Sequence, residues 1–130
     1  MATNPNFTNG ARITRAALSA ANVNRDGTGI VTSLMAGVAG GTKVNRVTVQ
    51  NSVSTTAGMI RLFISLDTGA TWSLFDEIAT AAVTVGASTV ANRSEKAYTD
   101  LELPSAASIL GCTTNNAEAC AVFAHGGDFV

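Results

Sequence analysis

The chain has 130 residues, the length of one domain, and 46% of them are hydrophobic while only 13% are charged. With a formal net charge of −1 and its eight Lys and Arg residues dispersed, it offers no basic stripe to a nucleic-acid backbone. It has no apolar run near the roughly 20 residues that span a bilayer, and its polar start does not resemble a secretory signal, so we expect no membrane segment and synthesis in the cytoplasm.

Residues 1–10 form the first predicted segment, an extended N-terminal arm. It contains one proline and one aromatic residue and shows no hydrophobic periodicity, which is typical of a terminus that packs weakly against its own domain. An arm of this kind can add a strand to a neighbouring protein or lie along its surface. The candidate contact residues in it are Asn4, Pro5, Asn6 and Phe7.

Residues 11–130 are predicted to form a single β-sandwich domain. Short β-branched segments alternate there with clusters of Gly, Asn, Ser and Asp, which is typical of antiparallel strands in an all-β fold. The number of strands matches a jelly roll or a similar sandwich. The alanine-rich first strand also permits a helix, and residues 80–93 fit a strand, a helix or a projecting loop. We predict strands at residues 11–18, 29–35, 43–51, 59–66, 71–78, 96–103, 108–113 and 119–124.

The pairing of these strands is predicted from their order. Val47 and Val49 alternate with polar residues, which indicates a half-buried strand. We expect the three strands within residues 43–78 to pair in sequence as a meander that holds the core, with Trp72 inside it. The last two strands flank residues 114–116, and this spacing predicts a terminal hairpin.

Two cysteines fall in that predicted hairpin. Cys112 and Cys120 are symmetric about Asn116, so a hairpin turning there would place them opposite each other. The sequence leaves open whether they form a cross-strand disulfide or remain free buried thiols. Together with His125 they supply fewer than the four ligands of a structural zinc site, and we predict no metal and no cofactor.

The sequence contains no group of residues that predicts catalysis. Its single histidine, His125, precedes two glycines, and no serine lies in a G-x-S-x-G elbow that would make Asp128 a triad partner. Asp76 and Glu77 are adjacent, and in a strand they would point to opposite faces, which prevents joint acid–base work. A salt bridge from one of them to Arg61 is the better interpretation. We therefore expect a protein that is not an enzyme.

Five segments resemble small virion proteins of tailed bacteriophages. They lie within residues 46–129, about two-thirds of the chain. The resemblance is structural and identifies no catalytic or ligand-binding residue. The segments are STTAGMIRLFI at residues 54–64, WSLFDEI at 72–78, LELP at 101–104, TNNAEA at 114–119 and AHGGDF at 124–129.

The resemblance implies a structural protein of the phage particle, of which a capsid decoration (cement) protein is the expected type. Its partners would be the major capsid protein or other virion proteins, and its location the virion. The low charge agrees with a surface that neighbours cover, and a homo-oligomer, with a trimer favoured, would suit a symmetric shell. The alternatives are a tail component (tube, terminator or fibre-associated subunit) and a carbohydrate-binding module.

Overall fold

The computed structural model describes residues 10–129, and all of its regular secondary structure is β-strand. The expected all-β class is therefore confirmed, and the alanine-rich first segment is a strand. No helix in the described range has the length and apolar character to cross a membrane. The strands are β1 (Gly10–Leu18), β2 (Thr32–Ala36), β3 (Thr42–Asn51), β4 (Gly58–Ser65), β5 (Ser73–Thr80), β6 (Arg93–Leu103), β7 (Ile109–Thr114) and β8 (Cys120–Asp128).

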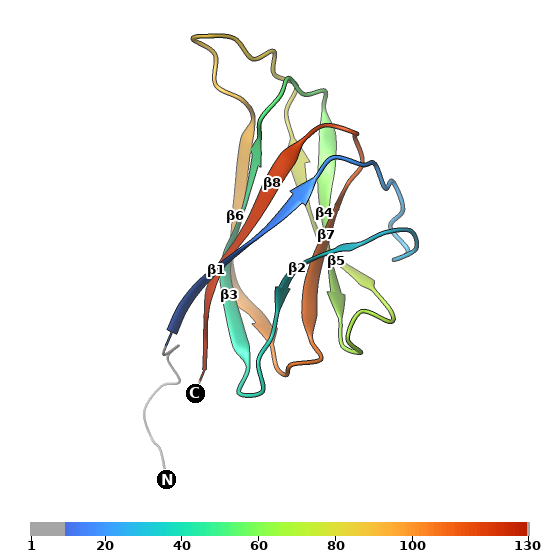
Figure 1. Cartoon of the computed structure of the whole chain (residues 1–130), viewed down its shortest axis with the longest axis vertical. Coiled ribbons are helices and arrows are strands. Elements are labelled where there is room, and N and C mark those ends of the chain that lie inside the picture. The colour runs from blue at the N-terminus through green and yellow to red at the C-terminus, as the bar shows by residue number, and fades with distance from the viewer. Residues whose placement is uncertain (1–9, 130) are drawn as a thin grey trace.

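The eight strands form two antiparallel sheets of four. Sheet A has the order β1-β8-β3-β6, and sheet B has the order β2-β7-β4-β5. Each strand of the first half pairs with one of the second half: β1 with β8, β2 with β7, β3 with β6 and β4 with β5. The chain is thus a long hairpin wrapped into a two-sheet sandwich (Figure 1), which is the arrangement of a jelly roll.

The core lies between the two sheets and follows the alternation of the strands. From sheet A it receives Val47 and Val49 of β3 and Val122 of β8, all fully buried, and from sheet B it receives Leu62 of β4 and Leu110 of β7. Because successive strand residues point to opposite faces, the residues between these positions form the two outer faces of the sandwich.

The predicted pairing of the central strands was wrong. β3 and β4 belong to opposite sheets, so only β4 and β5 pair as consecutive strands and the expected meander does not form. β7 and β8 also lie in opposite sheets, so the predicted terminal hairpin is absent. Both connections, residues 52–57 and 115–119, cross from one sheet to the other. Alternation identifies a strand, but an alternating strand fits either sheet equally well.

Residues 81–92, which the sequence left open, form a loop. It projects at the end of the sandwich opposite the C-terminal end of β8 (Figure 1). Isolated bridges join Thr55 to Val83 and Gly86 to Thr89. Residues 79–92 contain no charged side chain, and Val90 is 85% exposed. The structure therefore presents an uncharged loop at one pole of the molecule.

Candidate interaction surface

The outer face of sheet B is covered by the connection between β1 and β2, residues 19–31. The amide of Asn22 donates to the carbonyl of Thr114 at 2.8 Å, so the connection begins along the edge of β7. Further on, Gly27 lies against the backbone of Trp72 with φ at +84°, a conformation and a closeness that favour glycine. The connection lies outside sheet B (Figure 1) and shields that face from solvent.

An ion cluster joins this connection to the sheet beneath it. Glu77 lies 3.1 Å from the Nε atoms of both Arg61 and Arg25, so the predicted salt bridge to Arg61 is confirmed. The hydrogen bond from Arg25 and the positive charge of both arginines hold the pKa of Glu77 below its usual value, against the opposing effect of burial. The side chain of Arg61 is only 5% exposed. A buried arginine requires such a partner, so Glu77 has a structural role.

Asp76 points the other way, toward the neighbouring edge of sheet A. Its carboxylate accepts hydrogen bonds from Lys96 at 2.7 Å and from the Tyr98 hydroxyl at 2.8 Å. Burial raises the pKa of Asp76, but these hydrogen bonds outweigh it and leave the pKa lowered. Asp76 and Glu77 thus serve separate contacts, as their adjacent positions in a strand predict, and do not form a pair for acid–base chemistry.

Sheet A is different, because in the described part of the chain no loop lies outside it (Figure 1). Residues paired across an antiparallel ladder share a face, so the register identifies which residues point outward. We call this surface the open face. It consists of Ala11, Ile13, Arg15 and Ala17 of β1, Ala121, Phe123, His125 and Gly127 of β8, Lys43, Arg46, Thr48 and Gln50 of β3, and Arg93, Glu95, Ala97 and Glu102 of β6.

His125 lies on the open face among polar and charged side chains. Its Nε2 atom is 3.3 Å from the hydroxyl of Thr48. Partial burial and the positive charge of Arg46 lower its pKa, so the imidazole is neutral at physiological pH. Asp128, the candidate triad partner, is engaged elsewhere, with Arg12 at 3.3 Å and Thr42 at 2.7 Å. The structure does not bring these residues together as a triad.

The two cysteines are free and buried. Cys112 lies in sheet B and Cys120 in sheet A, so the hairpin geometry that would have placed them opposite each other was wrong. Burial raises the pKa of Cys112 to about 12 and that of Cys120 to about 11. Both side chains are therefore neutral thiols at physiological pH, and neither is an activated nucleophile.

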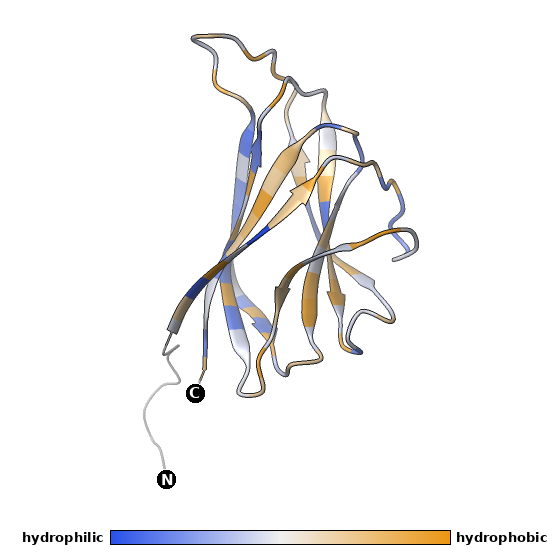
Figure 2. Cartoon of the chain, viewed as in Figure 1, coloured by the Kyte–Doolittle hydropathy of each residue, from blue (hydrophilic) through white to orange (hydrophobic). Residues whose placement is uncertain are grey.

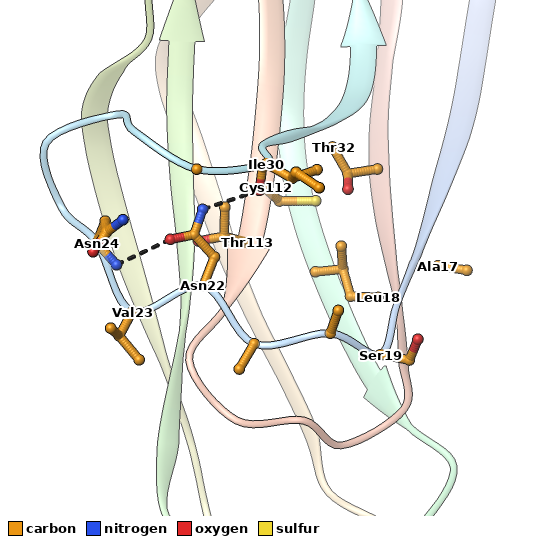
Figure 3. A pocket seen from close by; sticks show the side chains of 13 residues that line it. Ala17, Leu18, Ser19, Asn22, Val23, Asn24, Ile30, Thr32, Cys112 and Thr113 are labelled. Atoms are coloured by element: carbon orange, nitrogen blue, oxygen red, sulfur yellow. Dashed lines mark hydrogen bonds between the residues drawn. The ribbon is translucent and has the colours of Figure 1, made fainter.

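A hollow of about 440 Å³ opens between the β1–β2 connection and the edge of the sandwich. Figure 3 shows Leu18, Ile30 and Cys112 facing it. The side-chain amide of Asn22 donates a hydrogen bond to the carbonyl of Ile30 and accepts one from the backbone N–H of Asn24. The residues that line it include no carboxylate, histidine, lysine or arginine. The hollow therefore lacks groups for acid–base catalysis, and the side chains of Asn22 and Asn24 are engaged in hydrogen bonds within the connection.

A second hollow, of about 400 Å³, lies on the open face itself. The small side chains of Ala17 and Ala121 are located between the larger ones of Arg15, Gln50 and Phe123, and all five residues line the hollow. The sequence alone did not reveal this site. Ile13 and Leu18 are an odd number of positions apart in the first strand and therefore point to opposite faces. The hydrophobic pattern of this strand thus does not reveal which face is buried.

The remaining predicted residues have structural places. Trp72 was expected in the core, but it packs on the outer face of sheet B against Gly111. The candidate contact residues Asn4, Pro5, Asn6 and Phe7 lie outside the described residues, and β1 already begins at Gly10. Within residues 10–129, no three His, Cys, Asp or Glu side chains are grouped so that they could hold a metal ion.

No protein-family model matches the chain, and no curated protein matches it with significance.

Proposed function

We propose that this chain is a non-catalytic structural protein of a phage virion, a capsid decoration protein that binds and stabilises the head shell. The observation that carries the proposal is the unequal covering of the two sheets. The outer face of sheet B is shielded by the β1–β2 connection through Asn22, Arg25 and Gly27, while sheet A presents a broad face with Ile13 59% exposed. A protein that works by surface contact needs such a face.

The fold and the sequence resemblance support the same function. Jelly rolls are frequent among viral capsid domains, although a fold alone does not determine a function. The five segments that resemble virion proteins include most of β4, the start of β5 and the ends of β6 and β8. The uncharged loop at residues 81–92 offers a further contact element at one pole.

The same proposal includes the partners and the assembly state. The partner is the major capsid protein, and the chain acts as a homotrimer, because many copies on a symmetric shell gain affinity from multivalency. Light scattering of the purified protein should give three times the monomer mass of 13.2 kDa. A monomer or a hexameric ring would contradict the trimer, and a ring would favour a tail component.

The decisive test uses purified head shells from the source phage. The protein should co-sediment with shells in saturable fashion, raise their resistance to heat, and appear by cryo-electron microscopy at a fixed copy number on the head. Removal of residues 2–9 should weaken binding, because the proposed arm adds contacts to the shell. Absence of the protein from heads, or its presence along the tail, would refute the decoration function.

A carbohydrate-binding module receives less support from the aromatic residues. Phe75 and Tyr98 have ring centroids 5.7 Å apart and are tilted by 50°, which does not form a flat platform for a sugar ring. Trp72 packs against Gly111. No specific observation favours this class.

A further inference from the structure

Within the proposed function, we infer that the hollow on the open face is the docking site, and that it receives a shell-protein segment with an apolar side chain next to a carboxylate. The inference rests on the decoration function and names the chemistry of its partner. Three features of the hollow support it: its shape, its apolar residues and its charge.

The shape and the apolar residues come from β1 and β8. Ala17 and Ala121 are register partners, and together with Phe123 and Gln50 they line the hollow. Ile13 is 59% exposed on the same face. Figure 2 shows β8 mainly in the colours of hydrophobic residues and β1 in alternating hydrophobic and hydrophilic colours, whereas β6 is largely hydrophilic. Exposed apolar residues around a depression are typical of the centre of a protein interface.

The charge of the partner follows from the distribution of cations. The open face carries four cations against two carboxylates. Asp100 is exposed beside the register shift between β3 and β6 and has no register partner; with Asp100 counted on this face, its four cations still outnumber three carboxylates. The whole chain is weakly negative, but the open face is therefore positive. Its charged residues are Arg15, Lys43, Arg46, Arg93, Glu95 and Glu102.

Arg15 is the cation of the open face that would bind the partner's carboxylate. Glu95 is already shared by Arg93 at 3.3 Å and Arg46 at 4.0 Å. Arg15 lines the hollow and makes no salt bridge with any residue between positions 10 and 129. An approaching carboxylate would find an available guanidinium beside an apolar depression. Two open faces brought together would repel each other, so a second copy is a poor occupant of this site.

The test compares pairs of identical substitutions, one on the open face and one away from it. Phe123→Thr alters the hollow, while Phe75→Thr removes an aromatic ring that is 44% exposed on β5. Arg15→Gln removes the cation of the hollow, while Arg25→Gln removes an exposed cation from the β1–β2 connection. Binding of each purified variant to head shells is measured by co-sedimentation, and circular dichroism verifies that each variant is folded.

We expect Phe123→Thr to lower the affinity for shells by about tenfold or more and Arg15→Gln to lower it by about fivefold at low salt. The two control variants should bind like the wild type. Added salt should remove the effect of Arg15→Gln and leave that of Phe123→Thr.

The outcomes separate this inference from the proposed function. If the wild type fails to bind shells, the decoration function is refuted. If the wild type binds shells and both open-face variants bind as tightly as the wild type, the decoration function stands and the assigned docking site is wrong. If the open-face variants instead lose self-association, as seen by light scattering, the face joins copies of this chain and the acidic partner is refuted.

Discussion

The contact between Gly111 and Trp72 shows how one residue determines a packing arrangement. Gly111 occupies an outward position of β7, and a Cβ atom there would lie 2.7 Å from the indole ring of Trp72 and from a methyl group of Val31. The ring can pack this close to β7 only because position 111 has no side chain. From the sequence, Trp72 had been expected in the core, since no local pattern distinguishes a tryptophan between the sheets from one outside them.

We predict that Gly111→Ala destabilises the fold by about 1–3 kcal/mol, because the added methyl group must displace Trp72 or Val31. Denaturant unfolding measures the loss. Trp72 is the only tryptophan in the chain, so its native fluorescence should also shift. Gly86→Ala is the matched control, since a Cβ there meets no atom within 4 Å. Equal stability of the two variants would contradict the packing described.

Asp67 makes a second residue-scale contribution, in the turn between β4 and β5. Its carboxylate accepts hydrogen bonds from the hydroxyl and the amide of Thr71 and from the hydroxyl of Ser65. These bonds, those from Thr71 first, lower the pKa of Asp67 to about 2. In the unfolded chain the carboxyl group titrates near its ordinary value of 3.8.

Stability should therefore depend on pH through Asp67. As the pH falls from about 4 to about 2, the unfolded state binds a proton before the folded state does, so the stabilisation by Asp67 is lost in that window. We predict that Asp67→Asn lowers the melting temperature at neutral pH and that the difference from the wild type narrows toward pH 2. A difference that stays constant across this range would show that the carboxylate charge does not matter.

At the scale of elements, the sequence predicted the strands but not their partners. All eight predicted strands overlap the observed ones, because β-branched alternation and glycine-rich breaks are local signals. The connections at residues 52–57 and 115–119 were interpreted as links within one sheet, whereas both cross between sheets. Their lengths and compositions permit either path, and only burial of the whole core selects one. The salt bridge of Arg61 was predictable, but the open face was not, because it depends on this pairing.

Within the β1–β2 connection, the side chain of Asn22 makes more hydrogen bonds than any other. Asn22 donates to the carbonyls of Thr28 and Ile30 and accepts from the amide of Asn24. The side chain of Asn24 donates only to the Thr28 hydroxyl. Asn22 therefore makes three hydrogen bonds, two of which join the beginning of the connection to its end, whereas the side chain of Asn24 adds one exposed hydrogen bond.

We predict that Asn22→Ala loosens this connection far more than Asn24→Ala does. At about 1 kcal/mol for each hydrogen bond, the loss of two additional bonds should raise local opening by about tenfold or more. Trypsin cleavage after Arg25, whose side chain is 58% exposed, measures the opening under native conditions. Similar cleavage rates in the two variants would contradict the role of Asn22.

At the scale of the whole molecule, the two cysteines show whether the two sheets unfold cooperatively. Cys112 comes from sheet B and Cys120 from sheet A, and their exposed fractions are 0% and 5%. Each thiol borders a hollow but is buried, so a reagent reaches it only when the strands around it move apart. If the sandwich unfolds as one unit, both thiols become accessible in the same event.

We predict that neither thiol reacts with a disulfide reagent such as DTNB in native buffer, since each has a raised pKa and is buried. Both should react in concentrated guanidinium chloride, and at intermediate concentrations their labelling rates should be equal. Mass spectrometry of the labelled peptides resolves the two positions. Much faster labelling of Cys120 would show that β8 opens independently of sheet B.

The pairing of β1 with β8 has a practical consequence for engineering. Gly10 and Asp128 are register partners, so the two ends of the folded domain lie together at the pole opposite the loop of residues 81–92 (Figure 1). A short linker joining residue 129 to residue 10, with new termini opened within that loop, should give a circular permutant with every ladder intact. A reporter protein fused to a new terminus would then extend from the pole formed by the loop of residues 81–92.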